Sequence, residues 1–144
     1  MASTILVVQG PNLSYLGKRQ PEIYGTTTAA ELDAMLHEHA RRNDCTLDIF
    51  YTHVEGEAIG RIYQAVEAGV EGLLMNPAAF LFAGYALRDC LNAIPIPYVE
   101  VHLTNIDKRG IKSLTAEAAR GMITGFGPNS YILGLDALLA ILRA

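Results

Sequence analysis

Short apolar runs alternate along this chain with longer stretches in which apolar residues recur at helical spacing. The apolar runs fall at residues 4–9, 45–51, 72–75, 97–102 and 120–124. Short apolar runs bounded by turn residues are typical of strands buried on both faces of a sheet. The pattern therefore predicts five strands.

The amphipathic stretches between these runs predict helices at residues 28–42, 55–68, 83–91 and 130–143. Thr28 and Glu31 form a capping box at the start of the first helix, and Gly69 is expected to cap the end of the second. Residues 10–25 are rich in Gly, Pro and Asn and show no helical period, so we expect a loop, and a loop this long is usually functional. Residues 104–119 are also polar and irregular, with room for a short helical turn.

Strands that alternate with helices indicate a parallel sheet with helices on both faces. Five strands and about four helices match a flavodoxin-like α/β fold, most often with the strand order 2-1-3-4-5. In such sheets ligands bind outside the carboxyl ends of the strands.

Composition narrows the class of protein. The 144 residues suit one domain, and 51% hydrophobic with 18% charged residues indicates an ordered core. The high apolar fraction suggests subunit contacts, so we expect a homo-oligomer. The net charge of −4, with no basic run, makes nucleic acid a poor candidate partner.

The expected location is the cytoplasm. Cys45 and Cys90 show neither a close pair nor metal-type spacing, which suits a reducing compartment. The first residues lack the basic head and long apolar stretch of a signal peptide, and no window approaches the ~20 apolar residues of a membrane span. No membrane partner is therefore expected.

Polar side chains follow three of the predicted strands. They are Asn12, Arg19 and Tyr24 after the first, Asn76 after the third, and His102 and Thr104 after the fourth. Because the carboxyl ends of parallel strands meet at one edge of the sheet, these groups are expected to converge there.

Tyr24 and Arg19 form a candidate acid–base pair. A tyrosine hydroxyl is a poor base at neutral pH, but an adjacent guanidinium favours the phenolate because opposite charges attract. Such a pair in a loop can abstract a proton beneath a lid. The alternative is a surface loop with a stacked tyrosine, which spacing alone favours.

His102 is a candidate proton donor. It ends the fourth strand, and Glu100 lies on the same face of that strand because side chains alternate with a period of two. Glu100 would orient the imidazole or hold it protonated, so that it can protonate a leaving hydroxyl. The alternative is a histidine bonded to backbone at a strand end.

Asn12 and Asn76 each follow a strand and adjoin a proline. On sequence alone both are better explained as turn residues. The functional alternative is a hydrogen bond to a hydroxyl or to a developing enolate oxygen. We find no Walker loop, no GxSxG motif and no catalytic Cys–His signature.

Several segments together resemble one known family. GPNLSYLGKRQPEIYG at residues 10–25 is similar to the opening signature GPNLNxLGxRxPxxYG of type II 3-dehydroquinate dehydratases. NPAAF at 76–80, ALRD at 86–89, IPYVEVHLTNI at 96–106 and GFGPNSYILGLDAL near the end also match the family. The resemblance covers essentially the whole chain.

The resemblance implies a lyase that needs neither metal nor cofactor. Members of the family remove water from 3-dehydroquinate by anti elimination through an enolate, giving 3-dehydroshikimate. They are homo-oligomers, usually dodecamers built from trimers. The family serves the shikimate pathway of aromatic amino acid biosynthesis or quinate catabolism, and the sequence leaves that choice open.

The resemblance also implies a role for each matching residue. Tyr24 would abstract the proton beside the ketone, with Arg19 favouring its phenolate. His102, supported by Glu100, would protonate the departing hydroxyl. Asn12 would hold the water or enolate oxygen of the intermediate.

The substrate would be bound by a second set of matching residues. The backbone of Leu103 and Thr104 would hold its carboxylate, and Asn76 would contact its ring hydroxyls. Arg109 matches the first arginine of the family's loop. Asp89 would come from a trimer neighbour and steady a substrate-binding arginine.

The chain departs from the family pattern where the substrate ring is bound. Phe82 stands where the family has a histidine, and the loop at residues 105–113 is shorter and lacks a second arginine, with Lys112 as its only replacement. Losing one buried polar contact to a hydroxylated ligand costs about 1–3 kcal/mol.

Three hypotheses follow. The protein is a dehydroquinate dehydratase with altered affinity, a related lyase acting on a less hydroxylated carboxylic acid, or a low-activity binding or regulatory paralogue. Retention of Tyr24, Arg19 and His102 speaks against the third, whereas Phe82 and the short loop favour the second. We rank them in the order given.

Overall fold

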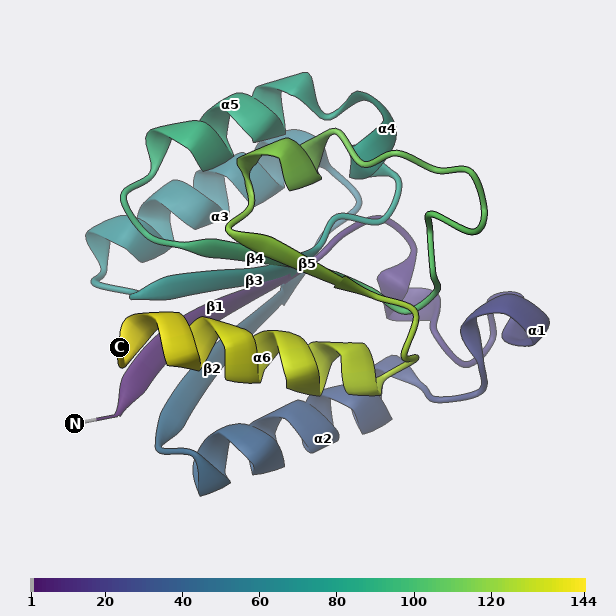
Figure 1. Ribbon diagram of the computed structural model, residues 1–144, viewed down its shortest axis with the longest axis horizontal. Coiled ribbons are helices and arrows are strands. Elements are labelled where there is room, and N and C mark those ends of the chain that lie inside the picture. Colours follow the sequence, from purple (N-terminus) through teal and green to yellow (C-terminus); the bar gives the residue numbers. More distant parts are fainter. Residues whose placement is uncertain (1) are drawn as a thin grey trace.

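Five parallel strands form one sheet in the computed structural model, which describes residues 2–144 (Figure 1). The strands are β1 (Ser3–Gln9), β2 (Cys45–Tyr51), β3 (Gly72–Asn76), β4 (Tyr98–His102) and β5 (Gly121–Thr124). Their order is β2-β1-β3-β4-β5, and every neighbouring pair is parallel. The flavodoxin-like order predicted from the sequence is confirmed.

Helices cover both faces of the sheet (Figure 1). The longer ones are α2 (Ala29–Arg42), α3 (Glu55–Glu67), α5 (Tyr85–Ala93) and α6 (Asn129–Leu142). Helices α2 and α6 pack on one face and α3 and α5 on the other. The predicted capping box starts α2, where the Glu31 backbone N–H donates to Thr28 Oγ1 and the Thr28 N–H donates to Glu31 Oε1.

Side chains alternate between the two faces along each strand. In β1, Ile5 and Val7 pack toward α2 and α6, whereas Leu6 and Val8 pack toward α3 and α5. The apolar runs are continuous because both faces are buried. The same alternation puts the polar residues at the strand ends on opposite faces of the sheet.

Helix α6 packs closely on the sheet at Gly134. A Cβ atom there would lie 2.5 Å from Val101 Cγ1 and 2.9 Å from Leu74 Cδ1, so a side chain at this position would force the helix or these neighbours to move. Gly134 thus lets α6 pack directly on β3 and β4. Because α6 begins shortly after β5 ends, its first turn lies at the carboxyl end of the sheet.

Two regions differ from the sequence prediction. The loop at 10–25 contains two short helices, η1 (Leu13–Tyr15) and α1 (Pro21–Tyr24), each too short to show a period in sequence. The helix predicted at 83–91 is divided into α4 (Phe80–Ala83) and α5. The division falls at Gly84, where a Cβ atom would lie 2.4 Å from the Phe80 carbonyl oxygen. The other elements end within two residues of their predicted bounds, an ordinary difference at fraying ends.

Residues 104–119 are mostly irregular, with one turn of 3₁₀ helix, η2 (Thr115–Ala118). Cys45 and Cys90 are both buried and free. No helix within residues 2–144 is long and apolar enough to cross a membrane.

Candidate active site

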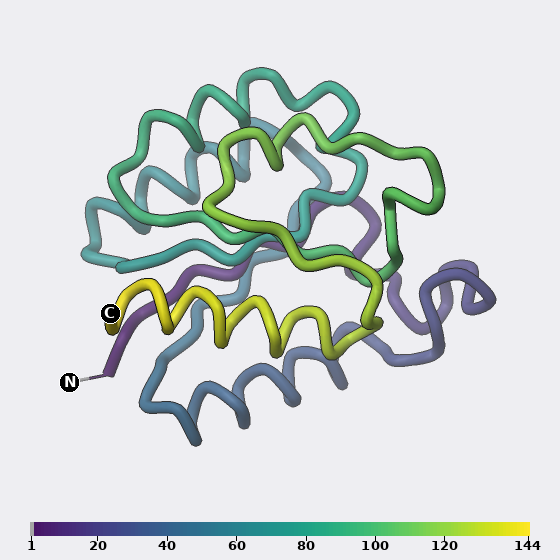
Figure 2. The backbone as a smooth tube through the Cα atoms, viewed as in Figure 1, coloured from purple at the N-terminus to yellow at the C-terminus, as the bar shows by residue number. Residues whose placement is uncertain are grey.

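A pocket lies at the carboxyl ends of β3 and β4, beneath the two irregular segments that follow β1 and β4. Figure 2 shows these two segments reaching the same end of the molecule. The polar residues that line the pocket are Arg19, Tyr24, Asn76, His102, Thr104 and Arg109. The predicted convergence of polar groups at the strand ends is confirmed for the first five of these residues. Arg109 was named only through the resemblance.

Tyr24 lies between two guanidinium groups. The Arg19 Cζ atom is 4.5 Å from the centre of the tyrosine ring, and the Arg109 Cζ atom is 5.7 Å from it. Arg109 Nη2 also donates to Tyr24 Oη at 3.5 Å, at the long end of hydrogen-bond distances. The cation that contacts the hydroxyl is therefore Arg109, whereas Arg19 stacks on the ring face.

Arg109 is held in place from the strand side. Its Nη1 donates to Thr104 Oγ1 at 2.9 Å. Thr104 follows β4 by two residues, so the end of the strand orients the guanidinium. A fixed cation beside a phenol favours the phenolate, which is the form that can act as a base.

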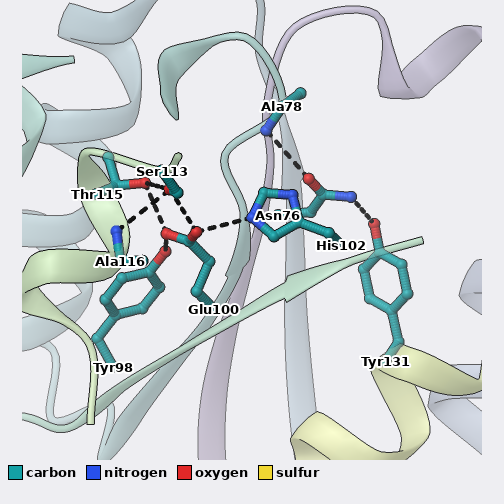
Figure 3. Close-up of polar contacts among 9 residues, drawn as sticks. All are labelled: Asn76, Ala78, Tyr98, Glu100, His102, Ser113, Thr115, Ala116 and Tyr131. Carbon is teal, nitrogen blue, oxygen red and sulfur yellow. Dashed lines mark hydrogen bonds and ion pairs between the residues drawn. The ribbon is translucent and has the colours of Figure 1, made fainter. Parts of the chain in front are cut away.

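His102 is bonded to Glu100 on the side away from the pocket. The distance from His102 Nε2 to Glu100 Oε2 is 2.7 Å, and both residues are buried (Figure 3). A carboxylate accepts hydrogen bonds, so Nε2 carries the proton and Nδ1 remains for a ligand. Glu100 therefore lies behind the histidine and does not line the pocket.

Glu100 is a fully buried carboxylate with four donors. Tyr98 Oη (2.5 Å) and Thr115 Oγ1 (2.6 Å) donate to Oε1, while Ser113 Oγ (2.6 Å) and His102 Nε2 (2.7 Å) bond Oε2 (Figure 3). Burial opposes ionisation, but these hydrogen bonds together outweigh it and hold the pKa of Glu100 below its ordinary value. The glutamate is thus ionised at neutral pH.

The same carboxylate anchors the segment between β4 and β5. Ser113 and Thr115 belong to that segment, and their hydroxyls reach Glu100 from outside the strand. Ser113 Oγ also accepts the backbone N–H of Ala116, which fixes the start of η2. The position of Arg109, earlier in the same segment, therefore depends on the group that orients His102.

Asn76 ends β3 and is nearly fully buried beside the pocket. Its Oδ1 accepts the backbone N–H of Ala78 at 3.0 Å, and its Nδ2 donates to the Tyr131 hydroxyl at 2.9 Å (Figure 3). Its side chain is consequently fixed by the protein before any ligand arrives.

Leu103 lines the pocket with Thr104, whereas Asn12 and Asp89, like Glu100, do not. Asn12 is exposed, has a left-handed backbone (φ 70°), and donates its backbone N–H to His53 Nδ1 at 3.1 Å. Asp89 is exposed on α5. The roles given to these residues by the resemblance remain predictions.

The sequence analysis missed the supporting residues Tyr98, Ser113, Thr115, Gln9 and Tyr131. One signal was available for the first three, because a glutamate inside an otherwise apolar strand requires nearby donors. The serine and threonine of the following irregular segment are the natural suppliers. Nothing in the sequence indicated that Tyr131, in the most apolar helix, would reach Asn76.

One wall of the pocket is apolar. It is formed by Ala78, Ala79, Leu81, Phe82, Ile106 and Ile111. The Phe82 side chain is 64% exposed at the pocket mouth. Within residues 2–144, no three His, Cys, Asp or Glu side chains are grouped so as to hold a metal ion.

The structure is a flavodoxin-like α/β domain in which a cation-flanked tyrosine and a carboxylate-bonded histidine share one pocket at the strand ends. Residues 3–139 match the family described as dehydroquinase class II. The chain belongs to that family.

The relatives cover nearly the whole chain. A protein of Cellvibrio japonicus named 3-dehydroquinate dehydratase is 44% identical over 143 residues, 97% of each chain, and one of the same name from Thioalkalivibrio sulfidiphilus is 41% identical over 137 residues, 93% of each. The crystal structure of the type II dehydroquinase from Butyrivibrio crossotus superposes with a TM-score of 0.92 at 34% identity, covering 96% of this chain and 98% of that one. The type II dehydroquinase from Propionibacterium acnes gives 0.90 at 35% identity, covering 100% and 99%.

Proposed function

We propose that this protein is a lyase that removes water from 3-dehydroquinate to give 3-dehydroshikimate. The observation that carries the proposal is the meeting of Tyr24, Arg109 and His102 in one pocket. The names of the relatives that are 41–44% identical support the same reaction.

The proposed reaction moves two protons and one hydroxyl. Tyr24, as phenolate, takes a proton from the carbon beside the substrate ketone, and the electrons of that C–H bond form an enolate. The enolate collapses, a C=C bond forms, and the C–O bond to the hydroxyl breaks. His102 gives a proton to the departing oxygen, so that it leaves as water.

The charged groups beside Tyr24 and His102 compensate the charges that these two residues carry during the proposed reaction. Arg109 and Arg19 favour the phenolate before proton transfer, and Glu100 compensates the charge of an imidazolium before His102 gives up its proton. The substrate carboxylate is proposed to lie at the backbone of Leu103 and Thr104, with Asn76 on a ring oxygen and Asn12 on the oxygen of the enolate.

The direct test is turnover of 3-dehydroquinate, followed by the ultraviolet absorbance of the conjugated enone acid. Tyr24→Phe is expected to lower kcat by about 10²–10⁴-fold, the contribution of a general base. Tyr15→Phe is the matched control, because Tyr15 belongs to the same segment, is exposed and does not line the pocket. No turnover by the unmodified protein would refute the proposal.

The apolar wall favours one second candidate, a related lyase acting on a less hydroxylated carboxylic acid. Phe82 offers no hydrogen bond to a ring hydroxyl, and its exposed ring provides apolar contact instead. An analogue of 3-dehydroquinate without a ring hydroxyl that the reaction does not use separates the two candidates. A higher kcat/KM for the analogue would favour the second.

We also propose that the chain forms homo-oligomers, trimers that associate into dodecamers. Asp89 is exposed on α5 and outside the pocket of its own chain, so a role near substrate requires a neighbouring copy. Light scattering measures the mass, and a monomer in dilute solution would contradict both the assembly and the role of Asp89.

A further inference from the structure

Three buried polar side chains form a chain of hydrogen bonds beneath the pocket, on the α6 face of the sheet. Gln9 and Tyr131 are 0% exposed, and Asn76 is 4% exposed. The Tyr131 hydroxyl donates to Gln9 Oε1 at 2.7 Å and accepts from Asn76 Nδ2 at 2.9 Å. Gln9 ends β1, Asn76 ends the neighbouring β3, and Tyr131 lies in the first turn of α6.

The direction of every hydrogen bond in this chain is set by one backbone group. The Ala78 N–H can only donate, so the atom of Asn76 that it contacts must be Oδ1. Nδ2 therefore faces Tyr131, whose oxygen must accept from it. The Tyr131 proton is then directed to Gln9, whose contacting atom must be Oε1.

Tyr131 is well suited to this role because its hydroxyl stays protonated. Burial raises the pKa of Tyr131, and the hydrogen bond from Asn76 offsets this only in part. The hydroxyl is thus a permanent single donor that can accept from Asn76. Rotation of the Asn76 amide by 180° would place its NH₂ group against the Ala78 N–H and is excluded.

The fixed amide determines what Asn76 offers to a ligand. One Nδ2 hydrogen is taken by Tyr131, which leaves the second for the pocket that Asn76 lines. A donor selects an acceptor, so the ligand atom at this position must be a carbonyl, carboxylate or hydroxyl oxygen.

The network is not explained by packing alone. A buried hydroxyl or amide costs stability unless it is bonded, and Gln9 Nε2 has no hydrogen-bond partner within the described residues. Apolar side chains would fill the same space without an unsatisfied group. Functional sites commonly keep residues that cost stability, such as a buried polar group without a hydrogen-bond partner.

We propose that Tyr131 and Gln9 are positioning residues that hold the Asn76 amide with a donor toward the substrate, an inference that rests on the proposed dehydratase function. They touch no substrate themselves, since neither lines the pocket. They act only through Asn76.

Steady-state kinetics with 3-dehydroquinate test the proposal. Tyr131→Phe is expected to raise KM about five- to tenfold, the worth of one hydrogen bond, with kcat within about twofold. The control is Ile62→Val, which removes a buried methyl group from α3 on the other face of the sheet. It lowers stability without touching Gln9, Tyr131 or Asn76, so its KM should not change. An equal rise in KM for both variants would overturn the proposal.

A double-mutant cycle tests whether Tyr131 acts through Asn76. In an Asn76→Ala background, Tyr131→Phe should change KM by less than about twofold, because the group it positions is gone. If the two substitutions together raise KM by the product of their separate effects, the proposal is contradicted. If Tyr131→Phe does not fold, Gln9→Leu is measured in its place, with a smaller rise in KM expected.

A third measurement separates this proposal from the proposed function. The side-chain NH₂ resonances of Asn76 are assigned by NMR from their loss in Asn76→Ala. In the unmodified protein one of the two protons should exchange slowly with water, and in Tyr131→Phe it should exchange more than about tenfold faster. If the unmodified protein does not turn over 3-dehydroquinate, the dehydratase function fails while this result still tests the positioning. Unchanged exchange in Tyr131→Phe would overturn the positioning even in an active enzyme.

Discussion

The two sides of the pocket are built in different ways. His102 and Asn76 end central strands, are almost fully buried, and are each bonded to buried partners. Tyr24 and Arg109 lie on the irregular segments after β1 and β4, and are held mainly by each other and by Thr104. Figure 1 shows α1, which carries Tyr24, projecting from the body of the molecule.

The difference separates a preorganised half from an adjustable half. Strand ends fix the His102 imidazole and the Asn76 amide, and the hydrogen bonds of both are made before a ligand arrives. The tyrosine and its arginine contact each other at the long limit of a hydrogen bond, so they can tighten when a ligand closes the pocket. Changes on the strand side should therefore affect stability and activity together, whereas changes on the segment side should affect activity alone.

The largest combined effect is expected for Glu100→Gln. The amide places an NH₂ group where a carboxylate oxygen accepted two hydrogen bonds, so either Tyr98 and Thr115 or Ser113 and His102 lose their acceptor. We expect a loss of about 3 kcal/mol in the free energy of unfolding and a clear fall in kcat. Urea denaturation and turnover measure the two. A stable variant with normal kcat would contradict the claim that changes on the strand side affect stability and activity together.

The segment side gives the contrasting case in Arg109→Ala. Arg109 contacts the Tyr24 hydroxyl, so its loss should lower kcat about 10- to 100-fold, while exposed substitutions change unfolding free energy by less than about 0.5 kcal/mol. Arg19→Ala is the matched variant, because Arg19 stacks on the same ring without a hydrogen bond to the hydroxyl. A larger fall in kcat for Arg19→Ala would assign the main electrostatic role to the stacked arginine.

Acid should lower the stability of the folded chain through Glu100, on the strand side of the pocket. The pKa of Glu100 is lower in the folded chain than in the unfolded chain, so its stabilising contribution is complete above the unfolded value of about 4.3 and is lost as the pH falls through the lower folded value. Unfolding free energy should decline over that range. Glu100→Gln carries no titrating carboxyl, so its decline should be shallower. Parallel pH curves for the two proteins would contradict this.

The smallest effect is expected for Thr115→Val, which removes one of the four donors on Glu100. Stability should fall by about 1 kcal/mol, and the tie between Glu100 and the segment that carries Arg109 should loosen. The kcat should fall less than in Arg109→Ala. Tyr98→Phe removes a different donor to the same oxygen from within the strand, so it should lower stability without that effect on the segment.

Much of the fold and half of the site could be predicted from the sequence. Continuous apolar runs and the alternation of strands and helices are local patterns, so the strand order and the convergence of Tyr24, His102 and Asn76 followed from them. The division at Gly84 could not be predicted, because it depends on a contact with the Phe80 carbonyl that exists only in the folded chain. Arg109 was placed by resemblance, and its contact with Tyr24 joins residues 85 positions apart.

Gly134 lies outside the pocket, and yet the residue at this position can affect which ligand the pocket selects. Because α6 rests directly on β3 and β4, the spacing between helix and sheet sets how far the Tyr131 hydroxyl extends toward Asn76. A methyl group there would force α6 or the side chains of Val101 and Leu74 to move. If the helix moves, the proposed positioning of Asn76 by Tyr131 weakens although every residue lining the pocket is unchanged. Redesign of this pocket for other acids can therefore begin with the distance between α6 and the sheet.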